Sequence, residues 1–183
     1  MRLLAPPIIT RRATVDDVDT LLHNVQTGFD SYTAFAPAGW QPPDVRAARE
    51  ISVALLGDPE TWALLALAGI DPVGHVAFFP GRERRLSDQA RGDWRLRPLI
   101  PGLAHFWQLF VLPDWWGRGV APLLHAAAIA EMRARGYERG RLFTPSLHAR
   151  ARRFYERRGW NAAEDAWGSE LGLMVTEYST GLR

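Results

Sequence analysis

The sequence predicts an α+β fold, or a mixed α/β fold, arranged around a single sheet. Short apolar runs bounded by Gly and Pro outnumber the amphipathic helical segments, and the two kinds of segment alternate irregularly along the chain. No internal repeat and no linker-like stretch divides the 183 residues, a length that is typical of one domain. We therefore expect a single domain over residues 1–183.

The first half of the chain predicts a strand, two helices and a hairpin. Thr14 is a good helix N-cap, the aspartates that follow suit a first helical turn, and apolar residues then recur at helical spacing. Gly57 ends the second helix, and a Gly-Ile-Asp segment separates the two apolar runs of the hairpin. In chain order we expect a strand at 8–12, helices at 15–29 and 44–56, and strands at 62–68 and 72–80.

Residues 80–102 differ from their surroundings, because they are polar, contain six Arg and show no apolar period. A loop of this length within a compact domain is usually functional or mobile, although a solvated surface insertion is the simpler interpretation. We predict an Arg-rich insertion without regular structure over this range.

The second half contains the clearest strand of the chain, HFWQLFVLP at 105–113, which is bounded by Pro and Gly on both sides. A helix follows whose apolar residues track one face, with Arg in its last turn and Gly136 at its end. We expect this helix at 120–135, a strand at 141–145, a short helix at 148–158 and a final strand at 171–178.

The composition excludes several kinds of chemistry. The chain has no Cys, which excludes disulfides, thiolate metal sites and a Cys nucleophile, and no Lys, which excludes a Schiff base and the phosphate-loop Lys. A net charge of +2 is a poor argument for nucleic-acid binding, and no apolar run is long enough for a membrane span or a signal peptide. We expect a cytoplasmic protein with no metal and with no nucleic-acid or membrane partner.

The segment GRGVA stands directly after the clearest strand and opens a helix, a position typical of an anion site. Gly117 and Gly119 can adopt backbone angles closed to other residues, and the first amides of a helix have no partner within it. The helix dipole and the charge of Arg118 add to the attraction for a phosphate or diphosphate. A tight turn in which the glycines serve packing alone is the alternative.

Two segments together resemble the motifs of the GCN5-related N-acetyltransferase (GNAT) superfamily. FVLPDWWGRGVAPLL resembles the strand, glycine turn and helix of motif A, with Gly119 and Ala121 on its last two positions. Trp116 stands where the family prefers Gln or Arg, and His148 stands where it often has Asn. Both motifs lie within residues 105–160, the motif-bearing part of the predicted domain. HARARRFYERRGW resembles motif B, with Ala151, Phe154, Tyr155, Gly159 and Trp160 as the matching residues.

The resemblance implies a mostly antiparallel central sheet flanked by helices, with a parallel pair of strands splayed apart at the cofactor site. It implies acetyl-CoA as co-substrate, with the pantetheine arm along the end of the clearest strand and the diphosphate on the glycine turn. Homodimers are common in the family, so a homodimer is a further expectation. The residues implied in cofactor binding are Phe110, Val111, Gly117, Arg118, Gly119, Val120, Ala121 and His148.

The resemblance also implies direct attack of a primary amine on the thioester, so that no nucleophilic side chain is needed. Tyr155 matches the family's general acid, and its hydroxyl is a donor at neutral pH, although its position also fits a core tyrosine. For the base that keeps the amine neutral we name His105, with Glu170 and Glu177 as alternatives. His75, within an apolar run, is interpreted as a packing histidine.

An aromatic wall is predicted for the acceptor pocket, because the chain has 8 Trp and gathers aromatic residues in the segment 31–43. In the family, the acceptor site lies partly under this connection between the first two helices. Such a wall suits an apolar or cationic small amine, or a peptide amine. We expect this segment, rather than the insertion at 80–102, to govern the choice of acceptor. The candidate substrate-binding residues are Tyr32, Trp40 and Trp107.

Two functions of other classes stay open at this point. The departures from the motifs at Trp116 and His148 allow a catalytically silent acyl-CoA sensor on the same fold. The Arg-rich insertion and the helix at 148–158 allow nucleic-acid binding, although acidic residues interrupt both patches. The prediction we carry forward is an acetyl-CoA-dependent N-acetyltransferase.

Overall fold

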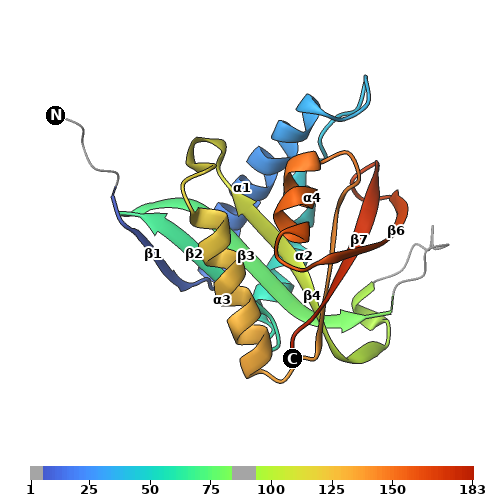
Figure 1. The fold of residues 1–183 in the computed structure, drawn as a ribbon. Coiled ribbons are helices and arrows are strands. Elements are labelled where there is room, and N and C mark those ends of the chain that lie inside the picture. The colour runs from blue at the N-terminus through green and yellow to red at the C-terminus, as the bar shows by residue number, and fades with distance from the viewer. Residues whose placement is uncertain (1–5, 84–93) are drawn as a thin grey trace.

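A seven-stranded sheet organises the chain, with its strands in the order β1-β2-β3-β4-β5-β7-β6 (Figure 1). The structure, a computed structural model, describes residues 6–83 and 94–183. The strands are β1 (Ile8–Arg12), β2 (Trp62–Ala68), β3 (Asp71–Arg82), β4 (Leu99–Val111), β5 (Arg139–Pro145), β6 (Asn161–Gly168) and β7 (Leu173–Gly181). The helices are α1 (Val18–Asp30), α2 (Arg49–Gly57), α3 (Val120–Ala134) and α4 (Ala149–Glu156).

The neighbours β4 and β5 run parallel, whereas all other neighbouring pairs among the described strands are antiparallel. They pair over three positions only, from Leu103 with Arg139 to His105 with Arg141. Beyond these positions β4 continues to Val111 paired with β3, and β5 continues paired with β7. The sheet is therefore mixed and splits between β4 and β5. This arrangement confirms the predicted α+β fold and its splayed parallel pair.

Helices cover both faces of the sheet. On one face lie α3 and α4, where Leu124 is fully buried, and on the other lie α1 and α2, where Leu21 is buried (Figure 1). The strand β2 contributes to both cores, because Leu64 packs in the first cluster and Leu65 in the second. A strand buried on both faces has no polar side, which explains the unbroken apolar run of this segment.

The expected insertion at 80–102 is wrong at both ends, because these ends belong to strands. Arg82 is still part of β3 and pairs with Leu99, where β4 begins. The Arg82 guanidinium also donates to the Arg97 carbonyl, at 2.6 Å. Arg82 places a charge in the last position of β3, and Pro101 and Gly102, which usually bound strands, lie within β4, so the sequence hides these strand ends. The middle of the insertion, residues 84–93, lies outside the described part of the chain.

The strand β6 was not expected, because its sequence carries no strand pattern. Six of its eight residues are exposed, since it is the edge strand of the sheet and pairs with β7 alone. The pairing also shifts register between Ala162 and Asp165. Such an edge needs no alternation of apolar residues, so periodicity could not reveal it.

Gly28 lets α1 approach the sheet closely at the end of β4. A Cβ atom at this position would lie 2.2 Å from Cδ1 of Phe110, well inside contact distance. The Phe110 ring is itself held in place, with its centroid 5.7 Å from that of Phe29 and 5.9 Å from that of His75. The absence of a side chain at Gly28 therefore sets the distance between α1 and β4.

We predict that Gly28→Leu lowers the free energy of unfolding by about 1–3 kcal/mol, the usual cost of overpacking a core. Leucine forms helices better than glycine by nearly 1 kcal/mol, so helix propensity alone would raise the free energy of unfolding. Gly57→Leu in α2 is the matched control, because a Cβ there would make an ordinary contact with Val15 at 3.7 Å. Urea unfolding of both variants tests the prediction, and equal free energies of unfolding for the two variants would contradict the packing argument.

Three histidines are buried or half-buried and have lowered pKa values. Burial lowers the pKa of His75 on β3 to about 4, and it lowers the pKa of His125 on α3 and of His148 before α4 to about 4 as well. His75 is 0% exposed, and the packing role expected for it agrees with this burial. The indole of Trp160 donates to Nε2 of His125, at 2.9 Å. All three rings are therefore neutral at pH 7.

We predict that acid destabilises the fold between pH 6.5 and pH 4. A histidine whose pKa is 6.5 when unfolded and about 4 when folded takes up its proton first in the unfolded chain, so stability falls as pH falls through this window. For His75 the loss from pH 7 to pH 5 is about 2 kcal/mol. In His75→Gln the fall in stability between these pH values should shrink by that amount. His23→Gln, at an exposed histidine, is the control, and an unchanged pH dependence in His75→Gln would contradict the prediction.

Candidate active site

A narrow cavity of about 80 Å³ lies where β4 and β5 separate. It is formed by the second half of β4, by the end of β5, by α4 and by the 3₁₀ turn after α1. The residues that line it are Tyr32, Phe106, Trp107, Gln108, Leu109, Phe110, Leu142, Phe143, Thr144, His148, Ala151 and Tyr155. The cavity therefore contains several residues named from the sequence: Tyr32, Trp107, Phe110, His148 and Tyr155.

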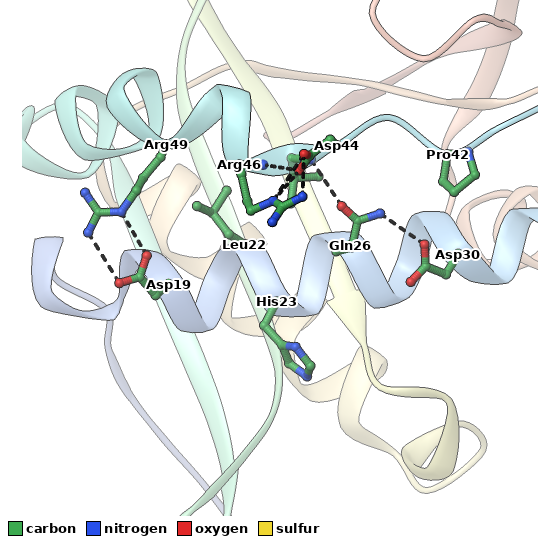
Figure 2. Close-up of a pocket in the computed structure, with 10 residues that line it drawn as sticks. Asp19, Leu22, His23, Gln26, Asp30, Pro42, Asp44, Arg46 and Arg49 are labelled. Carbon is green, nitrogen blue, oxygen red and sulfur yellow. Dashed lines mark hydrogen bonds and ion pairs between the residues drawn. The ribbon is translucent and has the colours of Figure 1, made fainter.

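A larger groove of about 550 Å³ lies between α1 and the segment that leads into α2 (Figure 2). Its charged side chains are already paired with one another, Arg49 with Asp19 at 2.9 Å and Arg46 with Asp44 at 2.8 Å. Gln26 donates to Asp30 at the other end of the groove, at 3.0 Å. Exposed charges that neutralise each other offer little to a ligand, so we place the chemistry in the smaller cavity.

The glycine turn has the geometry of an anion site. Gly117 and Gly119 have φ angles of 74° and 85°, which side-chain-bearing residues rarely adopt, and a Cβ at either position would meet open space. Gly119 is the N-cap of α3, and no acceptor for the amides of Val120 and Ala121 is found in the described part of the chain. Arg118 lies beside them, with its guanidinium 5.1 Å from the Trp115 ring. Donors and positive charge thus converge at an open surface.

The edge of β4 that faces the gap presents the backbone of Leu109 and Val111. Leu112 donates to Val73 of β3, at 2.9 Å, and bonding alternates along an antiparallel ladder, so the groups of Phe110 also point to β3. Leu109 could not be named from the sequence, because the register of the sheet decides which residues face the gap. Phe110 meets the cavity with its side chain instead.

Trp116 fills part of this open edge. Its indole nitrogen donates to the Val111 carbonyl, at 2.7 Å, so one of the two backbone acceptors on the gap side is already bonded. The Arg150 guanidinium, from the start of α4, stacks on the same indole, 4.3 Å from the ring centroid. The residue found where the family prefers Gln or Arg therefore connects β4 to α4 across the mouth of the gap.

Tyr155 on α4 reaches the cavity from the side of α3. It is 8% exposed, and its ring is surrounded by the rings of Phe106, Trp160 and Tyr178, with centroids 6.4, 6.0 and 6.2 Å away. Burial raises the pKa of the Tyr155 phenol far above its ordinary value, and the nearby phenol of Tyr32 raises it further. The hydroxyl therefore stays protonated and is a hydrogen-bond donor at every physiological pH.

His148 packs against the aromatic turn after α1. Its ring stacks on Phe35 at a centroid distance of 4.7 Å and meets Tyr32 edge-on at 5.2 Å. Since it also precedes α4 directly, it joins the acceptor side of the cavity to the helix that carries Tyr155. Burial, followed by the charge of Arg150, lowers its pKa, which leaves a neutral imidazole at the cavity wall.

The two tryptophans named for the acceptor wall have different positions. Trp107 lines the cavity, and its ring lies 5.7 Å from that of Phe79. Trp40 lies outside the lining, with its ring 6.4 Å from that of Tyr32, and its indole donates to the Leu171 carbonyl at 2.9 Å. Trp40 thus holds the turn that carries Tyr32 against the connection between β6 and β7.

None of the three base candidates lines the cavity. His105 lies between the rings of Phe79 and Phe143, with both centroids 5.2 Å away. Glu170 is exposed in the turn between β6 and β7, and Glu177 lies on β7 opposite Phe143. Gln108, which the motifs do not mark, lines the cavity and bonds to His75.

Two features are absent from the described ranges. Residues 6–83 and 94–183 contain no group of three or more His, Cys, Asp or Glu side chains placed to hold a metal ion. Over the same ranges, no helix has the length and apolar character required to cross a membrane.

Comparison with known proteins identifies the family. Residues 25–160 match the model of the acetyltransferase (GNAT) family, which covers more than half of the chain. No match is found among curated proteins. The many structural neighbours share the fold at low sequence identity.

Three of these neighbours illustrate the likeness. A GNAT-family acetyltransferase from Staphylococcus aureus Mu50 has a TM-score of 0.70 at 12% identity, covering 97% of this chain and 100% of its own. PaiA N-acetyltransferase from Thermoplasma acidophilum, solved with coenzyme A, has a TM-score of 0.64 at 15% identity over 93% of this chain and 98% of its own. The ribosomal-protein-S18-alanine N-acetyltransferase of Escherichia coli has a TM-score of 0.63 at 11% identity over 96% and 94%.

The residues that the family model matches include the splayed pair of strands and the glycine turn that opens α3. Members of the family transfer acyl groups from acetyl-CoA to amine acceptors in general. The chain therefore belongs to the GNAT family of acetyltransferases, and acetyl-CoA-dependent acyl transfer is its activity.

Proposed function

We propose that this protein transfers an acetyl group from acetyl-CoA to a primary amine by direct attack, with Tyr155 as general acid. The observation that carries the proposal is the position of the Tyr155 phenol, buried and protonated in the cavity between the splayed strands. The glycine turn at the mouth of this gap supplies the site for the diphosphate.

The cofactor is proposed to run from the glycine turn into the gap. Its diphosphate would accept hydrogen bonds from the amides of the turn and the first residues of α3, with Arg118 adding charge. Its pantetheine arm would lie along β4 and bond to the backbone groups that face the gap. The proposed cofactor-binding residues are Leu109, Phe110, Val111, Gly117, Arg118, Gly119, Val120, Ala121 and His148.

Two protons must move during the reaction. The thiolate expelled by the amine is a stronger base in a dry cavity than in water, and a buried phenol is a weaker acid there, so burial acts on both partners in the same direction. Tyr155 can therefore stabilise and protonate the leaving sulfur. For the proton of the amine we retain His105, which would act through solvent because it lies outside the lining.

The acceptor is proposed to enter past the aromatic turn. Tyr32 and Trp107 contribute to the wall, and Trp40 holds the turn in place from behind. These rings suit an apolar or cationic amine, either a small molecule or the amine of a peptide. The narrow cavity favours a short acyl group.

We predict that Gly119→Glu weakens CoA binding by about 10-fold or more, equal to about 1.4 kcal/mol. The new carboxylate would repel the diphosphate at the start of α3. Gly69→Glu, in the turn between β2 and β3, is the control, because Gly69 also has a positive φ, 66°, and open space around its Cβ. Both substitutions place the same side chain at a positive φ, so calorimetry with CoA isolates the local effect. Equal affinities for CoA in the two variants would contradict the proposal that the diphosphate binds at this turn.

We predict that Tyr155→Phe lowers turnover by about 10²–10⁴-fold while the affinity for acetyl-CoA changes little, since the ring that packs is retained. The measurement is thiol release from acetyl-CoA with a panel of small, aromatic and peptide amines. Tyr137→Phe, at a tyrosine outside the cavity, is the control. A wild-type protein that binds acetyl-CoA but acetylates no amine would be an acyl-CoA sensor instead.

A further inference from the structure

We propose that Gln108 on β4 is a catalytic residue, which donates a hydrogen bond from its side-chain amide to the carbonyl oxygen of the bound acetyl thioester. His75 and Asn24 are positioning residues that aim this amide. The inference rests on the proposed function, because it assigns a role within the same cavity.

Three polar side chains from three different elements form a hydrogen-bonded row. Asn24 on α1 is 2% exposed, and its Nδ2 lies 3.2 Å from Nδ1 of His75. His75 on β3 is 0% exposed, and its Nε2 lies 2.9 Å from Oε1 of Gln108. Gln108 lines the cavity, so the row leads from the layer of α1 to the site of the reaction.

Each end of the row determines whether one ring nitrogen of His75 carries a hydrogen. The amide nitrogen of Asn24 only donates, so Nδ1 accepts, and the amide oxygen of Gln108 only accepts, so Nε2 carries the hydrogen. The two ends agree on the same neutral tautomer. Burial lowers the pKa of His75 to about 4, so this form persists at pH 7.

The bond from His75 leaves the amide nitrogen of Gln108 available to a ligand. It holds the amide oxygen toward His75, and no acceptor for the amide nitrogen is found among residues 6–83 and 94–183. A donor oriented in advance inside a narrow cavity is worth more than the same donor in water, because no reorientation is needed during the reaction.

The chemistry of acetyl transfer indicates which reacting atom accepts the hydrogen bond from Gln108. The amine nitrogen forms a bond to the carbonyl carbon while the carbonyl electron pair moves onto oxygen; collapse of this intermediate restores the carbonyl, breaks the carbon–sulfur bond and expels a thiolate that takes up a proton. The nitrogen must lose a proton, and the sulfur has Tyr155 as its proposed donor. The oxygen gains negative charge and needs donors of its own, and Gln108 offers a side-chain donor beside the backbone amides of the β4 edge.

Infrared spectroscopy of bound acetyl-CoA, isotope-labelled at the thioester carbonyl, tests the contact without any acceptor. A hydrogen bond from Gln108 lowers the carbonyl stretching frequency, so Gln108→Leu should raise it while calorimetry shows little change in affinity. Gln26→Leu, at the glutamine that donates to Asp30 in the groove along α1, is the control for the same chemical change (Figure 2). An unchanged frequency in Gln108→Leu overturns the inference, whether or not the protein proves to acetylate an amine.

Kinetics test the catalytic and positioning roles separately. Gln108→Leu should lower kcat by about 10²–10³-fold with little change in the KM for acetyl-CoA, as loss of a donor to a developing oxyanion does. His75→Leu should lower kcat less, and His75→Gln, which keeps a donor, should restore part of the loss. In the Gln108→Leu background, His75→Leu should have no further effect on kcat. Wild-type kcat in Gln108→Leu overturns the catalytic role, and independent effects of the two substitutions overturn the positioning role.

Discussion

The split between β4 and β5 is the constraint on which the rest of the molecule depends. Parallel pairing ends after three positions, and the backbone of β4 beyond them has a neighbour on one side only. Backbone polar groups withdrawn from water are costly unless something bonds to them. Trp116 satisfies the Val111 carbonyl, and the remaining groups are left for a ligand with an extended, amide-rich chain. Pantetheine has that character, which is why we propose this edge of the sheet for the cofactor.

The helices beside the gap between β4 and β5 each contribute a different part of the proposed site. α3 begins at the glycine turn, α4 brings Tyr155 to the cavity, and α1 supplies Asn24 to the row that ends at Gln108. Gly28 sets how closely α1 can lie on β4. Catalytic groups on rigid elements are held more precisely than groups on loops. By contrast, the glycine turn and the turn that carries Tyr32 are irregular segments between these elements.

The sequence was sufficient for the fold class, the glycine turn and the position of Tyr155, because each depends on local pattern or on a motif. It was insufficient wherever the answer lay in register or in a distant neighbour. Which of Leu109, Phe110 and Val111 faces the gap follows from the pairing of β4 with β3. The row from Asn24 to Gln108 joins residues that are far apart in the chain. The strand β6 was missed because an exposed edge leaves no apolar period.

The bond from Trp40 to the Leu171 carbonyl links residues 131 positions apart. It ties the aromatic turn that carries Tyr32 to the connection between β6 and β7. Contacts of such long sequence separation carry a high closure entropy and form late. During synthesis, the edge of β4 and the glycine turn leave the ribosome before Leu171, which anchors the aromatic turn. The aromatic turn is therefore fixed only after residue 171 has been made, later than the glycine turn at the start of α3.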